Sequence, residues 1–166
     1  MPSPSEDVQI RRATSRDART LALLRYEFRS TLRDPVASQR AFVKRVQPWM
    51  ARELRARRWY AWIAEHDGDA VGCVWMFRMP KLPNPDGEPE MHGYVSNFYV
   101  RSALRGRGIG SRLLEAVIAV SNAEHVDSLI LWPTERSKPL YLRHGFRVAE
   151  GLLDKPIGAH WTTQAP

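Results

Sequence analysis

Hydrophobic and polar positions along the chain follow a strand period first and a helix period next. Residues 8–11 alternate, which indicates a first strand. A capping box from Thr14 to Asp17 precedes a stretch of helical spacing, whose apolar positions share one face: Ala18, Leu21, Leu24 and Phe28. Ser38 can cap a second helix with an apolar stripe of Phe42, Val46, Trp49, Met50 and Leu54. Pro48 interrupts that stripe, so we expect a kink or two consecutive short helices.

The middle of the chain has the pattern of paired strands. Residues 59–65 and 70–79 are rich in strand formers, and His66-Asp67-Gly68-Asp69 between them is a hairpin signal. Residues 80–90 hold too many prolines for a helix or a central strand. We expect a long surface loop there, which is a candidate functional loop, and another strand over 94–100.

The last part of the chain alternates between helix and strand. A helix is expected from about 108 to 123, with its apolar face toward a sheet, and a buried parallel strand over 128–132. Together with strand 94–100 they would form a right-handed β-α-β crossover. A short helix around Tyr141, stopped by Gly145, precedes a strand over 146–152, and 159–163 is a candidate edge strand.

Length and composition bound the class of protein. A chain of 166 residues, 43% of them hydrophobic, is long enough for one domain with a sizeable core, which we expect over residues 8–166. Its apolar stretches are short and broken by charge, so no membrane span is expected. Residues 1–7 lack the basic and apolar regions of an export signal, which favours a cytoplasmic protein.

The net charge and the positions of cysteine and histidine limit which ligands the chain is expected to bind. The net charge of +7 comes mainly from arginines spread along the chain, which favours a solvated surface with a local patch for a phosphorylated cofactor. Nucleic acid is therefore not the expected partner. The single Cys73 lies in an apolar run and is expected to fill the core rather than act as a nucleophile. The five histidines show no metal-ligand spacing, so no metal is expected.

One stretch, Arg105-Gly106-Arg107-Gly108-Ile109-Gly110-Ser111, lies between an expected strand and an expected helix. Its glycines let backbone N–H groups approach an anion, and the following helix adds the positive end of its dipole. The spacing fits neither G-x-G-x-x-G nor a Walker loop, which needs a lysine before the serine. The pattern predicts a loop that holds a pyrophosphate.

Two motifs carry a resemblance to a known family. Arg105, Gly108 and Gly110 form R-x-x-G-x-G, and Tyr141, Gly145 and Phe146 form Y-x-x-x-G-F. Their order resembles the GNAT superfamily of N-acetyltransferases. The resemblance implies an α/β (α+β) fold with a mixed central sheet of six to seven strands, splayed between the fourth and fifth, and about four helices. The implied order is β-α-α-β-β-β-α-β-α-β.

The resemblance also implies an activity, which is transfer of an acetyl group from acetyl-CoA to a primary amine by direct attack in a ternary complex. The pantetheine arm would pair with the backbone of Phe98, Tyr99 and Val100, and the Phe98 amide would bind the thioester oxygen. The pyrophosphate would lie on the backbone amides of the loop, with charge added by two arginines: Arg105, Gly106, Arg107, Gly108, Ile109, Gly110 and Ser111. Tyr141 would be the general acid that reprotonates the leaving sulfur.

The sequence does not identify the general base or the acceptor. The strand before the loop carries no glutamate, so the candidates are Glu88, Glu90, His92 or a water held by Asn97. Trp49 and Tyr26 could face the acceptor, although core packing is the expected role of each. The acidic side chains of Asp86, Glu88 and Glu90 would suit a cationic acceptor, either a small molecule or a protein amine.

Two other functions compete with catalysis on a free amine. One is a coenzyme A-binding sensor that has lost turnover, against which the retained Tyr141 argues. The other is an acetyltransferase directed at tRNA, which the basic charge suggests. A homodimer would fit the family as well.

Overall fold

A computed structural model of the chain describes residues 7–155 and 157. The chain divides into two compact units, Met1–Leu131 and Trp132–Pro166. No helix among the described residues has the length and apolar character needed to cross a membrane.

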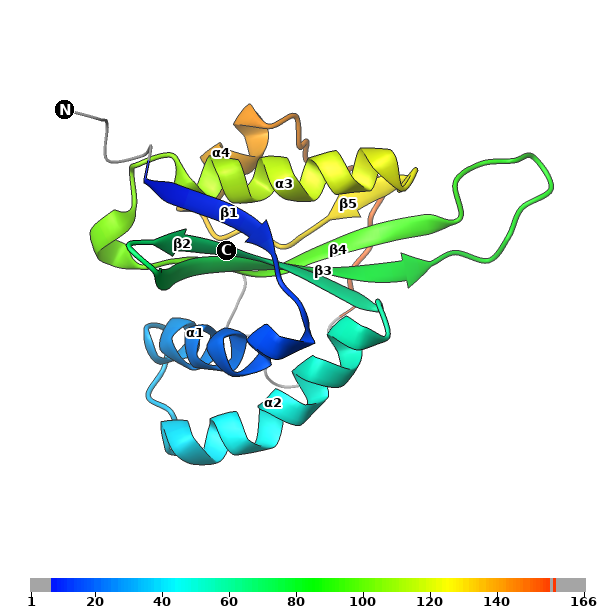
Figure 1. Ribbon diagram of the computed structural model, residues 1–166. Coiled ribbons are helices and arrows are strands. Elements are labelled where there is room, and N and C mark those ends of the chain that lie inside the picture. The colour runs from blue at the N-terminus through cyan, green and yellow to red at the C-terminus, as the bar shows by residue number, and fades with distance from the viewer. Residues whose placement is uncertain (1–6, 156, 158–166) are drawn as a thin grey trace. The chain divides into compact units, whose positions relative to one another are not determined.

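The first unit is built on one sheet whose strands lie in chain order, with every neighbouring pair antiparallel except β4 and β5, which are parallel. The strands are β1 (Val8–Arg12), β2 (Trp59–His66), β3 (Asp69–Pro80), β4 (Met91–Val100) and β5 (Ser128–Ile130). Figure 1 shows this sheet between two helical layers.

A tight turn connects β2 to β3 and a long loop connects β3 to β4, and both were expected. Asp67 and Gly68 have φ angles of 51° and 81°, the pair of positive values that a two-residue hairpin turn requires. Residues 81–90 form an exposed loop that projects beyond the sheet in Figure 1, and the Lys81 N–H donates to the Glu90 carbonyl at 2.8 Å across its base.

Helices α1 (Ala18–Ser30) and α2 (Gln39–Arg55) cover one face of the sheet (Figure 1). The Thr14 to Asp17 capping box closes on the short 3-10 helix η1 (Ser15–Asp17), which leads into α1. The Ser38 side chain accepts a hydrogen bond from the Ala41 N–H, which caps α2. Helix α2 is continuous through Pro48 and bends along its length in Figure 1, so the kink forms and two separate helices do not.

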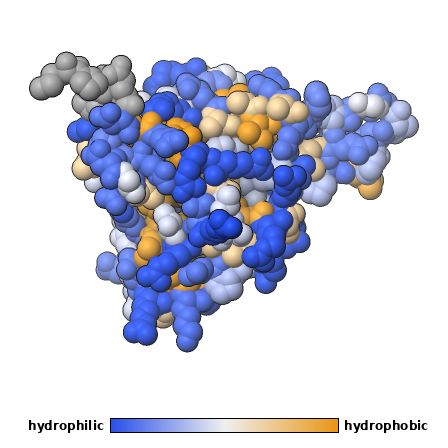
Figure 2. All heavy atoms as spheres, in the orientation of Figure 1, coloured by the Kyte–Doolittle hydropathy of each residue, from blue (hydrophilic) through white to orange (hydrophobic). Residues whose placement is uncertain are grey.

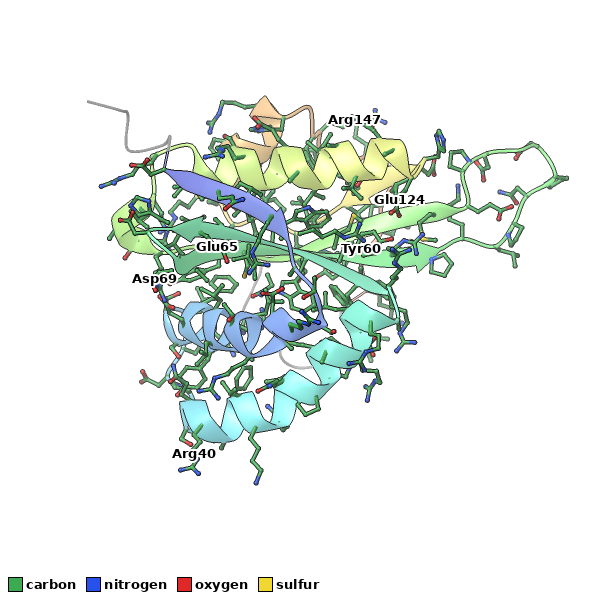
Figure 3. The ribbon with its side chains drawn as sticks, in the orientation of Figure 1. Arg40, Tyr60, Glu65, Asp69, Glu124 and Arg147 are labelled. Carbon is green, nitrogen blue, oxygen red and sulfur yellow. The ribbon has the colours of Figure 1, made fainter. Side chains whose placement is uncertain are left out.

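Helix α3 (Ile109–Ala123) covers the opposite face of the sheet. Alternate side chains of β2 and β3 therefore enter two separate cores, with Ala61 and Ile63 toward α1 and α2, and Tyr60 and Trp62 toward α3. Figure 3 labels Tyr60 and Glu124, whose hydroxyl and carboxylate are 2.9 Å apart and connect β2 to the residue after α3.

The second unit contains α4 (Lys138–Arg143), and here one expectation is wrong. The Gly145 N–H bonds to the Leu142 carbonyl and the Phe146 N–H to the Tyr141 carbonyl, which is the hydrogen-bond pattern of a glycine C-cap. Gly145 has the φ of 83° that this cap needs. Phe146 thus ends a helix and does not begin a strand.

The sheet has five strands within the described chain, so a count of six to seven is not confirmed. Residues 146–152 form coil and a turn, and Val148 and Leu152 are exposed, because no ladder hydrogen bonds pair this segment. The candidate strand over 159–163 lies outside the described residues. The parallel β-α-β crossover through α3 is confirmed, with β5 ending at Ile130.

Candidate active site

The centre of the candidate site is the place where β4 and β5 stop pairing. Their parallel register runs from His92 and Ser128 to Tyr94 and Ile130. From there to Val100, no other strand of the described residues pairs with β4 on that side. Gly93 permits this close pairing, because a Cβ there would lie 2.5 Å from Leu129 Cδ2. Beyond Tyr94, the backbone of β4 offers an open edge to an extended ligand.

A β-bulge sits in the unpaired half of β4. Cys73 pairs with Tyr99 and Trp75 pairs with Ser96, so β4 carries one extra residue between these pairs. Asn97 takes up the irregularity with a φ of 49°, a left-handed conformation that asparagine tolerates better than most residues. The side chains of Ser96 and Asn97 therefore reach the same cavity.

The bulge also sets the directions of the next side chains. Phe98 packs against the core on the α3 face, and Tyr99 lies in the core on the α1 and α2 face. The Tyr99 hydroxyl donates to Glu27 Oε1 at 3.0 Å, and Arg101 Nε donates to the same oxygen at 2.9 Å. Burial, together with Glu27, raises the pKa of Tyr99. This cluster fastens the end of β4 to α1.

The glycine loop follows directly, after the 3-10 helix η2 (Ser102–Leu104). Gly106 and Gly108 have φ angles of 76° and 75°, and nothing lies within 4 Å of where a Cβ would stand. Gly108 is the N-cap of α3 and provides no side-chain cap, so the N–H groups of the first turn are left for another acceptor. These features fit a bound pyrophosphate.

The two loop arginines are in different situations. Arg105 Nε donates to the Val100 carbonyl at 2.8 Å, and its guanidinium lies 5.9 Å from the Tyr99 ring centroid. Arg105 therefore holds the loop against the end of β4. Arg107 is exposed.

A cavity of about 130 Å³ lies beside the bulge. Three indoles line it, Trp49 from α2, Trp59 from β2 and Trp75 from β3, with ring centroids 6.3 Å apart for the first two and 6.0 Å for the last two. Arg25, Ser96 and Asn97 supply its polar groups. A larger cavity of about 370 Å³, among Arg12, Arg55 and Arg57, includes no residue of β4 or of the glycine loop.

Arg25 projects from α1 into this site. Its Nη1 donates to Asn97 Oδ1 at 3.0 Å, and no ion pair joins it to a carboxylate of the described chain. Burial lowers the pKa of Arg25, and Arg29 lowers it further. The guanidinium is thus a desolvated cation without a countercharge. Of the other aromatic candidates, Trp49 lines the cavity, whereas the Tyr26 hydroxyl donates to the Ala37 carbonyl and its ring packs on Phe42.

The candidate bases lie at the other end of β4. Glu88 is 3.0 Å from Lys81 Nζ, and Lys81 and Asn84 lower the pKa of this loop carboxylate. His92 Nδ1 is 2.8 Å from Ser128 Oγ. Along the strand, at roughly 3.3 Å per residue, His92 is about 20 Å from Phe98. The fold therefore brings neither Glu88 nor His92 to Phe98. Glu90 lies in the same loop as Glu88, just before β4, whereas Asn97 is next to Phe98 in the strand.

Tyr141 belongs to the second unit. Its ring packs against Phe146 at a centroid distance of 5.5 Å, and burial raises its pKa. The hydroxyl is therefore protonated at neutral pH, as a general acid requires. Its catalytic role stays a prediction.

Cys73 fills the core, as expected. It is fully buried, and burial raises the pKa of its thiol to about 12. Within the described chain, no group of three histidine, cysteine or acidic side chains is arranged to hold a metal ion.

The pattern analysis missed Arg25, Trp59 and Trp75 as site residues. A signal for Arg25 was present, because it lies four positions after Leu21 and three before Phe28, on the apolar face of α1. A charge on a core-facing stripe is unusual. The two tryptophans had no such signal, since large aromatic side chains are ordinary in buried strands.

Comparisons with known proteins identify the family and the fold. Residues 22–146 match the family model of the acetyltransferase (GNAT) family. The fold is similar to a predicted acetyltransferase from Clostridium acetobutylicum, solved with acetyl-CoA, at 19% identity and a TM-score of 0.75, over 90% of this chain and 96% of that one. A GCN5-related N-acetyltransferase from Ralstonia eutropha JMP134 has 24% identity and a TM-score of 0.73, with coverage of 90% and 98%.

A glucosamine-6-phosphate N-acetyltransferase from Arabidopsis thaliana is also similar, at 18% identity and a TM-score of 0.66, with 91% of this chain and 99% of that chain covered. Because all three identities are below 25%, the similarity to these structures shows the fold alone. No curated protein matched the sequence significantly.

Proposed function

Because the chain belongs to the GNAT acetyltransferase family and is thus an acyltransferase, we propose that it transfers the acetyl group of acetyl-CoA to a primary amine by direct attack in a ternary complex. One observation carries the proposal. The open edge of β4 beyond Tyr94 is followed, after the short 3-10 helix η2, by the glycine loop and the uncapped start of α3. That arrangement suits a ligand with an amide-bearing arm and a pyrophosphate.

We assign cofactor binding to the backbone of this segment. The amide-bearing arm would pair with Phe98, Tyr99 and Val100 as an added half-strand. The pyrophosphate would accept hydrogen bonds from the amides of residues 106–111, and Arg107 would add positive charge at the surface. Arg105 would act mainly by positioning the loop, since its Nε is already bonded to the Val100 carbonyl.

The chemistry needs charge stabilisation and two proton movements. As the amine attacks the thioester carbon, negative charge develops on the carbonyl oxygen, and the Phe98 N–H would stabilise it. Before the attack, the acceptor ammonium gives its extra proton to a water that Asn97 orients, which frees the nitrogen lone pair. The C–S bond then breaks, and Tyr141 would protonate the departing sulfur. The water route is favoured over Glu88, Glu90 and His92 because those three belong to the far end of β4 or the loop before it.

The acceptor we propose is a small molecule. The cavity beside the bulge, at about 130 Å³, is similar in size to cavities of roughly 150 Å³ that hold a single benzene ring. The structural similarity to an enzyme of glucosamine 6-phosphate supports a small amine as the acceptor class.

The direct test is isothermal titration of the purified chain with acetyl-CoA, for the wild type, Gly108→Asp and Gly87→Asp. Both glycines have a φ near 75–78° and open space around them, so the two variants suffer the same backbone strain and gain the same charge. Only Gly108 caps α3. We expect micromolar binding that is lost in Gly108→Asp and kept in Gly87→Asp. Equal binding by both folded variants would contradict the assignment of the loop.

Turnover separates the enzyme from a sensor that only binds the coenzyme. Release of free thiol from acetyl-CoA, measured over a panel of primary amines, should exceed the rate without amine. A protein that binds acetyl-CoA but accelerates no amine would be a binding module instead.

A further inference from the structure

The cavity beside the bulge is electrostatically incomplete. Of the described residues that line it, Arg25 alone carries a charge. Within the described part of the chain, its hydrogen-bond partner is the neutral Asn97 side chain, at 3.0 Å. A guanidinium presents five donors, so most of them are left for a ligand. Keeping a cation partly buried without a countercharge costs free energy, which a bound anion would recover.

Apart from Arg25, Ser96 and Asn97, the described residues that line the cavity are Met50 and three tryptophans. Trp49, Trp59 and Trp75 come from three different elements, and Trp59 also contacts the rings of Phe77 and Tyr94. Indole faces of this kind pack against a hydrocarbon or aromatic group of a ligand. The cavity volume limits that group to about one ring or a short chain.

We propose, resting on the proposed acetyl transfer, that the acceptor is a small amine that carries one carboxylate beside an apolar side chain, which is the chemistry of a hydrophobic amino acid. Arg25 binds the carboxylate in the manner of an arginine fork, and the three indoles hold the side chain. Ser96 and Asn97 border the same cavity next to Phe98, so an amine on the carbon that bears the carboxylate lies near the amide assigned to the thioester oxygen.

Two other acceptor chemistries fit less well. A polyamine or another polycation would place further positive charge against Arg25, and the acidic residues of the loop, Asp86 and Glu88 among them, do not line the cavity. A phosphate carries close to two negative charges at neutral pH, and one guanidinium would leave part of that charge uncompensated. A monoanion matches the single cation.

Binding can be measured without the coenzyme, because three indoles line the site. We would titrate the full chain with L-phenylalanine and L-phenylalaninamide, and with L-leucine and L-leucinamide, following tryptophan fluorescence at about pH 6, where the amines are protonated. Each pair differs in the carboxylate. The wild type should prefer at least one acid over its amide by tenfold or more, as expected for a charge-assisted pair. Equal or weaker binding of both acids would overturn the proposal.

Variants of Arg25 test whether this side chain causes the preference for the amino acid over its amide. Arg25→Gln should remove the preference, because binding of the amino acid becomes weaker while binding of its amide stays the same. Arg25→Lys should restore part of the preference. Arg19→Gln is the matched control, since it removes the same charge from an exposed position of α1 outside the cavity. A preference that survives Arg25→Gln in a protein with a wild-type melting curve would contradict the role of Arg25.

The coenzyme titration keeps this inference separate from the function on which it rests. Binding of acetyl-CoA without a carboxylate preference would refute the acceptor class and leave the acetyltransferase proposal standing. A carboxylate preference without acetyl-CoA binding would refute the acetyltransferase proposal and leave the cavity as a binding site for a hydrophobic amino acid.

Discussion

At the scale of single residues, the conformation of the site depends on side chains that bond to neighbours in other elements. Asn97 shows this most clearly, because its Oδ1 accepts from Arg25 while its Nδ2 lies 3.7 Å from Cys73 Sγ. Helix α1, strand β3 and the bulge of β4 therefore meet at one amide. The orientation of that amide determines where a bound water or acceptor can sit.

Tyr141→Phe tests the general acid. Removing the hydroxyl should lower kcat roughly tenfold or more, because positioned acids typically contribute about 10² to 10⁴ in rate. The Kd for acetyl-CoA should hardly change. Steady-state kinetics and isothermal titration measure the two quantities. Tyr26→Phe is the control, since it removes a hydroxyl that bonds to the Ala37 carbonyl outside the cavity, and it should keep full activity. A Tyr141→Phe enzyme at full rate would exclude the role.

The buried carboxylate of Glu53 leads to a prediction of how the stability of the fold depends on pH. It is buried on α2 and accepts two hydrogen bonds from Arg58, at 2.7 and 2.8 Å, which lower the pKa of its carboxyl. A lowered folded-state pKa means that the pair stabilises the fold above the ordinary carboxyl pKa and that this stabilisation is lost as the pH falls through the folded-state value.

Glu53→Gln should therefore lower Tm by a few degrees at about pH 7, and the difference from wild type should shrink toward about pH 3. Thermal unfolding followed by circular dichroism across that range is the measurement. Asp34→Asn, in the exposed connection between α1 and α2, should leave Tm nearly unchanged at both ends. A difference for Glu53→Gln that is constant with pH would show that its charge does not matter.

At the scale of elements, the bend in α2 has a clear origin. Pro48 lies inside the helix, where it supplies no N–H to the ladder. The neighbouring Trp49 lines the cavity, so the bend and the cavity wall occur in the same turn.

Pro48→Ala should raise the free energy of unfolding, by as much as about 3 kcal/mol if α2 can straighten without loss of packing. Chemical denaturation measures the change. Pro139→Ala is the matched control, because Pro139 lies in the first turn of α4, where proline is favourable, and it should bring no gain. A loss of stability in Pro48→Ala would mean that packing against the sheet requires the bend.

The sequence pattern predicted most elements because each has a strong local signal, such as the capping box at Thr14 or the glycine turn at Gly68. The error over 146–152 arose where two signals overlapped, since Phe146 is both a good strand former and the residue that completes a helix cap. The bulge at Asn97 was beyond local patterns, because it is defined by its pairing with β3. Trp59 and Trp75 could not be assigned to the cavity because large aromatic side chains are ordinary in buried strands.

At the scale of the whole molecule, the net charge of +7 comes from basic residues that are spread along the chain. Several arginines are already paired, among them Arg11 with Asp17 and Glu65, Arg58 with Glu53 and Arg101 with Glu27. On the face drawn in Figure 2, hydrophilic residues dominate, and hydrophobic ones form small separate patches. This distribution favours a solvated surface over a nucleic-acid footprint.

A fluorescently labelled tRNA should therefore bind only non-specifically, with a Kd of about 10⁻⁶ M or weaker at physiological salt, and should not displace acetyl-CoA. Anisotropy titrations over a range of salt concentrations measure the affinity and its salt dependence. Tight binding that falls steeply with salt and survives an excess of unrelated RNA would support the tRNA-directed acetyltransferase instead.

The extra residue in β4 has an evolutionary consequence. Ser96 and Tyr99 pair with Trp75 and Cys73, which share one face of the sheet, so deleting Asn97 would leave a regular strand in which Phe98 and Tyr99 keep their faces. The deletion would remove only the amide that binds Arg25. Descendants of this gene can change the cavity by substitution at Arg25 or at the tryptophans. A one-residue deletion at Asn97 is a second route to a new acceptor, because it changes the cavity while the side chains of β4 keep their places in the two cores.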